Sequence, residues 1–403
     1  MEQCGDRYEA ERLRIALEIA ALPSEDSGRP ASIDVEAASL LWTKAARLEG
    51  VSRDNMYGRV RELLERQAQT DNRTQVPTSA QTLYLRGELA RVSDALRAAL
   101  ENIGFYYLTG HGIPTDLVQN TFGACQAFHA LPLEQKLAIR MNEHLVGYLP
   151  VNGYISKSSR IEQARKPNFV EAFFAKREVA SGADTDTRLY RAPNLWPPQA
   201  LLPSFKQSVV DYCAAMEALC LMMLPAYAQA LEMDADFFAP AFVDAQFTLR
   251  MSHYPPADRG EDDQYGVAPH TDSSFLTMLA QPDLPGLSIR LESGEWIEAP
   301  VVPDSFIVNS GDLLRRWTNH RFLSTPHRVI NSNIDDRYAI PFFYDANVDY
   351  PMECISSCCP PDNPARYEPT TYVEYMRWFA AQYAADDNQN TTTVEDPAPA
   401  LAN

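Results

Sequence analysis

Two residues that could bind a metal stand beside a short apolar run in the segment GVAPHTDSSFLTML, residues 266–279. His270 and Asp272 are separated by one residue, and imidazole and carboxylate groups are both common ligands of divalent metals. On an extended segment, the two-residue period of a β-strand places both side chains on the same face. The pair alone does not distinguish a metal site from a turn that contains a histidine, because such a site needs a further ligand.

A third candidate ligand is His327 in FLSTPHRVIN, which opens another short apolar run 54 intervening residues after Asp272. Two histidines and one carboxylate on one face of a metal form the facial triad of non-haem Fe(II) oxygenases, and the opposite positions stay open. A structural zinc site would instead be closed by four protein ligands. The three residues are therefore a candidate facial triad.

A buried cation is expected ten residues after His327. Arg337 begins the apolar segment RYAIPFFYDA, and NSNIDD before it is expected to form a hairpin turn. Strand periodicity places Arg337, Ala339 and Pro341 on one face, which with the right register is also the metal face. A guanidinium inside an apolar barrel requires an anionic partner. A carboxylate of a substrate or co-substrate, held by two parallel hydrogen bonds, would supply it.

The elements that position these residues change in character along the chain. Apolar residues at helical spacing predict a helical extension over residues 1–80, ending in a linker at 69–81, and further helices over 83–103 and 205–231. After residue 245, short apolar runs alternate with turn signals, which predicts many β-strands. We expect a β-sandwich or jelly roll there, followed by a helix around YVEYMRWFAAQYA.

Composition excludes several classes of function. The net charge of −19 argues against a nucleic-acid partner. No apolar run approaches 18 residues, and the N-terminus lacks the uninterrupted apolar stretch of a signal peptide, so we expect neither a membrane partner nor export. The seven cysteines are odd in number, and CISSCC lacks the second ligand pair of a zinc site. They are expected to be reduced thiols of a cytoplasmic protein.

Together, these motifs resemble the Fe(II)/2-oxoglutarate-dependent dioxygenase superfamily, in particular its isopenicillin N synthase-like subgroup. The pattern H-T-D, then H, then R carries the resemblance. Similar segments also include ALENIGFYYLTGHGIP, LRMSHYPP, RWTNHRFLSTPHRVI and RYAIPFFYD, so that the likeness covers about residues 85–380.

The resemblance implies an α+β fold, with a double-stranded β-helix (jelly-roll) core, flanking helices and the N-terminal helical extension. Four parts are expected: the extension at 1–80, the N-terminal helical and strand region of a dioxygenase at 81–235, the jelly-roll domain at 245–348, and a C-terminal helix with a disordered tail at 349–403.

The resemblance also implies the site. His270, Asp272 and His327 would bind Fe(II), Arg337 and Tyr254 would hold 2-oxoglutarate, and O2 would be the other co-substrate. The expected activity is hydroxylation, desaturation or cyclisation of a small organic molecule in specialised metabolism, by a monomer. Two positions depart from the family pattern: Ala339 replaces a serine that usually follows the arginine, and Ser252 replaces an asparagine two residues before the tyrosine.

Two other functions stay open. The loss of a hydroxyl donor at Ala339 favours an Fe(II) oxidase of the isopenicillin N synthase type that does not use 2-oxoglutarate, and turnover without succinate would identify it. The same barrel could instead be a non-catalytic module that binds metal or 2-oxoglutarate. A zinc hydrolase is disfavoured, because no H-E-x-x-H motif supplies a general base.

The remaining candidates have a structural and a functional interpretation. Phe275 and Phe343 would line either the substrate pocket or the core. The basic residues of the segment 147–174 would meet either solvent or an acidic substrate; these are Lys157, Arg160, Arg165 and Lys166. The other histidines are expected to be non-ligands: His111 and His253 as structural residues, and His129, His144 and His320 because no partner pattern accompanies them.

Overall fold

The structure is a computed structural model of the whole chain. It describes residues 18–19, 89–155, 164–178, 191–256, 264–280, 284–331 and 335–384. The predicted linker at 69–81, the C-terminal tail and most of the predicted N-terminal extension lie outside these ranges. The boundaries of the four expected parts stay predictions.

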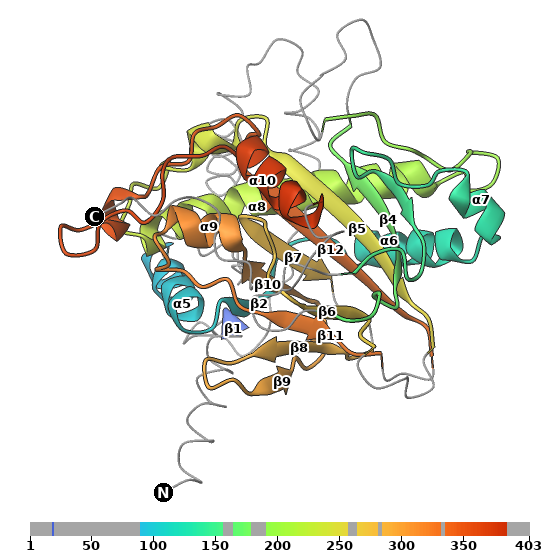
Figure 1. Ribbon diagram of the computed structural model, residues 1–403, viewed down its shortest axis with the longest axis horizontal. Coiled ribbons are helices and arrows are strands. Elements are labelled where there is room, and N and C mark those ends of the chain that lie inside the picture. Colours follow the sequence, from blue (N-terminus) through green and yellow to red (C-terminus); the bar gives the residue numbers. More distant parts are fainter. Residues whose placement is uncertain are drawn as a thin grey trace, which may run out of the picture.

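Two β-sheets form the centre of the fold (Figure 1). The larger sheet has eight strands in the order β1-β2-β10-β7-β12-β5-β4-β3, and the smaller has the order β6-β11-β8-β9. The strands of the larger sheet are β1 (Glu18–Ile19), β2 (Phe105–Thr109), β3 (Gly147–Leu149), β4 (Glu171–Lys176), β5 (Gln246–Tyr254), β7 (Leu276–Ala280), β10 (Ser305–Ser310) and β12 (Arg337–Asp345). Those of the smaller sheet are β6 (Val267–His270), β8 (Leu287–Arg290), β9 (Trp296–Glu298) and β11 (His327–Val329).

Helices cover the face of the larger sheet that is turned away from the smaller one, and Figure 1 shows α8 along that side. The helices are α5 (Leu89–Asn102), α6 (Thr115–His129), α7 (Leu133–Leu137), α8 (Phe205–Ala230), α9 (Asp312–Trp317) and α10 (Tyr372–Ala384), with 3-10 turns η2 (Ala239–Phe242) and η3 (Ser356–Cys358). Helix α8 is long and apolar enough to cross a membrane by composition, but its apolar side chains pack in the core of this fold.

The alternation of side chains along the strands builds the two cores of this three-layer arrangement. In β10, Phe306 and Val308 pack in the core beneath the helices, whereas Ile307 packs between the sheets. The same alternation on β5 sends Met251 towards the helices and Tyr254 towards the smaller sheet. The space between the sheets therefore receives every second residue of β5 and β12.

The predicted jelly-roll class is confirmed, as are the helices near 83–103, 205–231 and 372–384 and the strands after residue 245. The predicted hairpin between His327 and Arg337 is wrong, because β11 pairs with β6 and β8 whereas β12 pairs with β5 and β7. The chain instead crosses from one sheet to the other. This crossover is why Arg337 reaches the site from the facing sheet.

Two further expectations are corrected. Glu18 and Ile19, in the predicted N-terminal helix, form a strand that pairs in parallel with the edge strand β2, whose backbone groups would otherwise lack a neighbour on that side. Cys354 and Cys359 form a disulfide, since the intervening turn η3 brings the two residues together. Reduced, buried thiols are found at Cys125, Cys213, Cys220 and Cys358.

Candidate active site

The candidate triad lies at the pairing of β6 with β11. His270 is the last residue of β6, and its direct cross-strand partner is His327, the first residue of β11. Asp272 follows β6 by two residues, so the His-x-Asp pair spans the end of a strand. The third ligand candidate thus comes from the adjacent strand, which brings the two imidazole ring centres to 4.3 Å.

The spacing of the three polar groups is that of ligand atoms around one metal ion. Asp272 Oδ1 lies 3.6 Å from His270 Nε2 and 3.5 Å from His327 Nε2. All three atoms lie within 4.8 Å of one another. Atoms bound about 2.1 Å from one metal are about 3 to 3.5 Å apart, whereas hydrogen-bonded atoms approach to roughly 2.7–3.0 Å. The group therefore fits a metal better than it fits a direct hydrogen-bond network.

Backbone carbonyls orient both imidazoles. His270 Nδ1 lies 2.9 Å from the carbonyl oxygen of Ala268, and His327 Nδ1 lies 3.1 Å from that of Thr325. Since a carbonyl only accepts hydrogen bonds, each Nδ1 carries the proton in the neutral ring. Each Nε2 then presents its lone pair towards Asp272, which is the tautomer that metal binding requires.

Two neutral donors occupy the other oxygen of Asp272. The Thr277 hydroxyl donates to Oδ2 at 2.6 Å, and the Asn309 amide donates to it at 2.8 Å. Thr277 and Asn309 are paired residues of β7 and β10, so the sheet itself sets their spacing. Oδ1 is left for a metal, and the carboxylate is held in one orientation.

A close backbone approach keeps Asp272 in place. The Asp312 amide donates a 2.7 Å hydrogen bond to the Asp272 carbonyl at the start of α9. A side chain at the preceding residue, Gly311, would place its Cβ 2.1 Å from the Ser274 carbonyl oxygen. Only glycine permits this approach.

The protonation states suit a cation site. Burial raises the pKa of Asp272, but the nearby imidazoles of His327 and His270 outweigh this effect and hold it well below the usual range. Burial and His327 lower the pKa of His270. The pKa of His327 is lowered by burial but raised overall by Asp272. An ionised carboxylate between two imidazoles is the state that binds a divalent metal.

Arg337 reaches the space between the sheets from β12, as its spacing predicted. It is buried, its Nε donates to the Leu284 carbonyl at 3.3 Å, and its Nη1 is buried with no hydrogen-bond partner in the part of the chain that the structure describes. Its Cζ lies 4.9 Å from the centre of the Tyr254 ring, and the two residues are cross-strand partners. Gly286, with a φ of +144°, leaves room beside it, since a Cβ there would meet Nε at 3.2 Å.

This orphaned nitrogen fits a carboxylate ligand. Burial lowers the pKa of Arg337, and Tyr254 offsets this effect only in part. A buried guanidinium with an unused donor is costly, and a dicarboxylate anchored at that donor would remove the cost. The absence of a hydroxyl at Ala339, which is buried here, leaves this guanidinium as the principal donor on that face of β12.

Comparison with known proteins decides the family. The 2OG-Fe(II) oxygenase superfamily matches residues 245–346, and the N-terminal region described as that of the non-haem dioxygenase in morphine synthesis matches residues 78–199. The chain is 33% identical over 299 residues to the 2-oxoglutarate-Fe(II) type oxidoreductase hxnY of Emericella nidulans, covering 72% of this chain and 83% of that one. The chain belongs to the 2OG-Fe(II) oxygenase superfamily.

Other members of the superfamily are similar in sequence and in structure. The 2-oxoglutarate-dependent dioxygenase citB of Monascus ruber is 37% identical over 269 residues, which cover 64% of this chain and 80% of citB. A full-length Neurospora crassa protein, solved in complex with alpha-KG, is 26% identical with a TM-score of 0.65, covering 74% of this chain and 91% of that one. A 2OG-Fe(II) oxygenase family protein of Caulobacter crescentus is 28% identical with a TM-score of 0.66, over 75% and 96% of the two chains. The protein is therefore an Fe(II)- and 2-oxoglutarate-dependent oxygenase that acts on a small molecule.

One charged residue of this oxygenase was missed by the sequence reading. Arg250 lies four residues before Tyr254 on β5, so the two side chains share the face towards the smaller sheet. Its Nε and Nη2 are buried without a hydrogen-bond partner among the described residues. Its Cζ lies 5.6 Å from the ring centre of Phe174 and 5.9 Å from that of Tyr154. The two-residue period from Tyr254 could have found it.

The structure places most other candidates away from the triad. Phe275 packs in the core beneath the helices, where its ring lies 4.9 Å from that of Phe242. His111 is buried and accepts a hydrogen bond from the Ile113 amide, in a structural role as expected. Lys157 and Arg160 lie outside the described residues. Phe343 is the exception: it is half-buried and is the cross-strand partner of Thr277, whose hydroxyl bonds Asp272, so it lies on the triad side of β12. Arg165 is exposed and Lys166 is half-buried.

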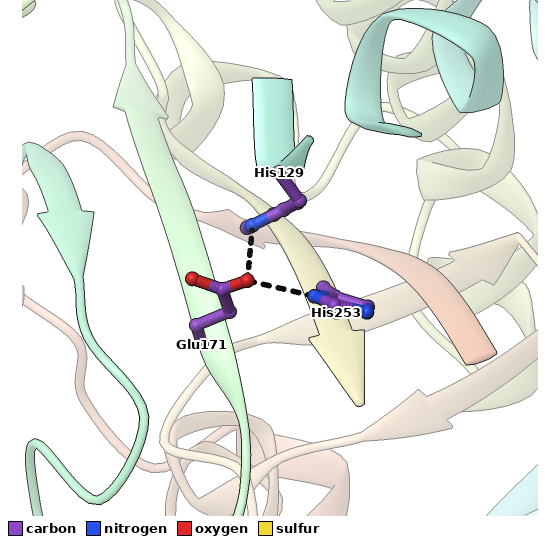
Figure 2. A group of neighbouring side chains, drawn as sticks. All are labelled: His129, Glu171 and His253. Atoms are coloured by element: carbon purple, nitrogen blue, oxygen red, sulfur yellow. Dashed lines mark hydrogen bonds and ion pairs between the residues drawn. The ribbon is translucent and has the colours of Figure 1, made fainter. Parts of the chain in front are cut away.

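The sequence did not predict a second cluster of two histidines and a carboxylate. His129 was expected to have no partner residues, but it lies with Glu171 and His253, as Figure 2 shows. His253 lies on the face of β5 opposite Tyr254, as predicted.

Proposed function

We propose that His270, Asp272 and His327 bind the Fe(II) of this oxygenase and that Arg337 and Tyr254 hold 2-oxoglutarate. The observation that carries this proposal is the orientation of three potential ligand atoms. Two imidazole Nε2 atoms lie 3.5–3.6 Å from one carboxylate oxygen. The other polar atoms of the three side chains are hydrogen-bonded elsewhere. When bound, iron with 2-oxoglutarate and O2 supplies the oxidising power for attack on an unreactive C–H bond.

The residues of the chain position the reactants. Three protein ligands on one face leave the other coordination positions open. The orphaned Nη1 of Arg337 would hold the far carboxylate of 2-oxoglutarate, with the Tyr254 ring beside it. The low exposure of Asp272 and His327, 5% and 9% of the side chain, limits the access of water to the centre.

Anaerobic reconstitution tests this assignment. Wild-type protein with Fe(II) and 2-oxoglutarate is expected to show a weak visible charge-transfer band, which disappears in His270→Ala and weakens in Arg337→Ala. Aerobic turnover is expected to form succinate in step with oxidised substrate. A folded protein that binds iron but shows no band and forms no succinate would favour the oxidase or the non-catalytic module.

We also propose that the substrate carries an anionic or strongly accepting group that pairs with Arg250. Two of its guanidinium nitrogens are buried without hydrogen-bond partners among the described residues, on the face that Tyr254 shares. Burial lowers the pKa of Arg250, but Tyr154, Tyr254 and Asp272 outweigh this effect and raise it, so the guanidinium is charged and has donors to spare. Carboxylate-bearing compounds should stimulate O2 consumption by the loaded enzyme more than their neutral amides. Arg250→Met should abolish this preference, and Arg250→Lys should retain part of it. Equal stimulation by acids and amides in wild-type protein would refute the pairing.

The finer classification is likewise our proposal. The motifs around residues 104–114 and 249–256 support the isopenicillin N synthase-like subgroup. A cytoplasmic location is supported by the four buried free thiols, against one local disulfide between Cys354 and Cys359 among the described residues. We further propose that the enzyme acts in specialised metabolism.

We also propose that the enzyme works as a monomer. Light scattering on the purified chain tests this, and an apparent mass of twice 45.2 kDa would contradict it.

A further inference from the structure

The second cluster joins three elements behind the 2-oxoglutarate residues. His129 ends α6, Glu171 begins β4, and His253 is the penultimate residue of β5, and in Figure 2 both imidazoles face the carboxylate. Glu171 Oε1 lies 2.7 Å from His253 Nδ1 and 3.4 Å from His129 Nδ1. The side chains of His129 and Glu171 are 0% and 6% exposed, so this is a buried polar group that needs an explanation.

The distances indicate a proton on His253, not a metal. At 2.7 Å, Nδ1 and Oε1 are at the length of a strong charge-assisted hydrogen bond, and they are closer than two atoms bound to one metal. The other ring nitrogen, Nε2, lies 2.6 Å from Asp336 Oδ1. Ionised carboxylates only accept hydrogen bonds, so both ring nitrogens donate and the ring is an imidazolium.

The other donors complete a balanced set of charges. Lys136 Nζ donates to Glu171 Oε2 at 2.7 Å, and the Tyr148 hydroxyl donates to the same oxygen. Glu171 and Asp336 are then matched by Lys136 and protonated His253. A divalent metal in place of the proton would leave excess positive charge in a buried site, which is unfavourable.

The remaining member of the cluster, His129, has a neutral ring. Its Nε2 lies 3.0 Å from the Met251 carbonyl and therefore donates to it, and its Nδ1 is buried without a hydrogen-bond partner among the described residues. Burial lowers the pKa of His129. The bare nitrogen opposite Glu171 is the one feature of the cluster that would suit a metal, so a test must exclude that alternative.

The pKa shifts agree with this assignment. Burial lowers the pKa of His253, but its bonds with Glu171 and Asp336 outweigh burial and raise it above 6.5. Burial raises the pKa of Glu171, yet the surrounding donors outweigh this effect and keep it ionised. The titratable and charged groups facing His253 or its partner carboxylate are Glu171 from β4, Asp336 just before β12, Tyr338 from β12, His129 and Cys125 from α6, Lys136 from α7 and Tyr148 from β3.

The register of the strands connects this cluster to the co-substrate site. Glu171, His253 and Tyr338 are direct neighbours across β4, β5 and β12, and the His253 and Tyr338 rings stack at 4.8 Å. One residue further along, Tyr254 and Arg337 are the next cross-strand pair, and they point to the opposite face. A slip or separation of β5 and β12 at His253 would therefore displace Tyr254 and Arg337 as well.

We propose that His253 is a positioning residue, held as an imidazolium between Glu171 and Asp336, that fixes the spacing of β5 and β12 where Tyr254 and Arg337 hold 2-oxoglutarate. The inference rests on the proposed function of Tyr254 and Arg337. Asp336 directly precedes Arg337, so the ionic link restrains the first residue of the binding strand from behind the sheet.

The test measures 2-oxoglutarate affinity by anaerobic titration of the Fe(II) charge-transfer band between about pH 6 and 8.5, a range that spans the ordinary histidine pKa. His253→Gln should weaken binding roughly five- to tenfold at low pH, the loss expected for the net contribution of one ordinary hydrogen bond. Asp336→Asn should weaken it about two- to threefold, because Asp336 is half exposed. Saturating 2-oxoglutarate should restore kcat to within about twofold, since the iron ligands are untouched.

The pH profile separates positioning from mere stability. Wild-type affinity should fall as pH rises through the raised pKa of His253, and His253→Gln should lack this step, so that the two proteins converge at high pH. His320→Gln is the control, since His320 is bonded to Arg315 and Tyr367 and not to this cluster. A lower melting temperature in His253→Gln with wild-type affinity at every pH would overturn the positioning role.

The same samples distinguish the other failures. Elemental analysis should find one iron per chain in wild-type protein and in His253→Gln. Two metals per chain, with the second lost in His253→Gln, would overturn the imidazolium assignment in favour of a metal. Iron-loaded wild-type protein without a 2-oxoglutarate band would overturn the proposed function and the inference with it. A wild-type band whose half-saturating 2-oxoglutarate concentration is unchanged in His253→Gln at every pH would overturn the inference alone.

Discussion

The described part of the chain contains two buried groups of two histidines and one carboxylate, and the two groups differ in how their other polar atoms are bonded. At His270, Asp272 and His327, the carboxylate oxygen that faces the rings is 3.5–3.6 Å from them. In the second group, Glu171 Oε1 lies 2.7 Å from His253 Nδ1 and 3.4 Å from His129 Nδ1, so that one ring and not both is in direct hydrogen-bond contact. Both groups combine two imidazoles with one carboxylate, so this combination does not by itself distinguish a metal site from a protonated network.

The partners of each carboxylate explain the difference. Asp272 Oδ2 accepts from the neutral groups of Thr277 and Asn309, which leaves its negative charge available to an added cation. Glu171 Oε2 is already paired with Lys136, and its Oε1 with His253. Whether such a site binds a metal or a proton therefore depends on the negative charge that its other partners leave uncompensated, and not only on the residue types of its ligands.

The largest expected effect comes from a substitution that disrupts only the first group. His327→Ala should remove Fe(II) binding and lower turnover by at least about a thousandfold, because two protein ligands cannot complete the facial triad. Iron content by elemental analysis and succinate formation are the measurements. His129→Gln is the matched control in the second group and should retain one iron per chain. If His129→Gln lost the iron and His327→Ala kept it, the second group and not the first would be the iron site.

A large loss of stability is expected when the second group loses its lysine. Lys136→Met should lower the free energy of unfolding by about 3–5 kcal/mol, since it leaves Glu171 buried with one cation fewer. Urea denaturation measures this change. Lys206→Met removes an ion pair of the same 2.7 Å length with Glu178, but one that is 54% and 41% exposed, so its expected cost is below about 1 kcal/mol. Equal costs for the two variants would show that burial is not the cause.

A smaller effect is expected from the neutral donors of the first group. Asn309→Ala should weaken Fe(II) affinity about 10- to 100-fold, because Asp272 loses one of the two bonds that orient it. Competition with a coloured chelator measures the affinity. The variant Asn363→Ala, far from the triad in the turn after η3, is expected to bind iron like wild-type protein. Unchanged affinity in Asn309→Ala would mean that the Thr277 hydroxyl alone orients the carboxylate.

The smallest effect is a dependence of stability on pH. The pKa of His253 is raised in the folded protein, so its contribution is fully present below the unfolded value of about 6.5 and is lost as pH rises through the folded pKa. Over that rise in pH, we expect the free energy of unfolding to fall by on the order of 1 kcal/mol more in the wild-type protein than in His253→Gln. Melting curves at several pH values measure it. Parallel curves for the two proteins would indicate a neutral His253.

Local patterns predicted a large part of the fold and of the proposed site. Period-two alternation and turn residues located the strands after residue 245, because both signals depend on neighbours in the chain. The spacing of His270, Asp272, His327 and Arg337 named the candidate ligands in advance. The pairing of β6 with β11 and of β5 with β12 was not predictable in this way, since register depends on contacts between distant segments.

The sequence by itself determined which residues are available for iron and 2-oxoglutarate, because a facial triad and a buried arginine leave a recognisable spacing. Tertiary structure alone decided that His129, Glu171 and His253, each separated by many residues, form a second cluster, and that Arg250 turns towards the smaller sheet. It also set the 2.7 Å and 3.5 Å separations that distinguish the two clusters. Those distances arise from strand register and packing, which no local pattern of residues encodes.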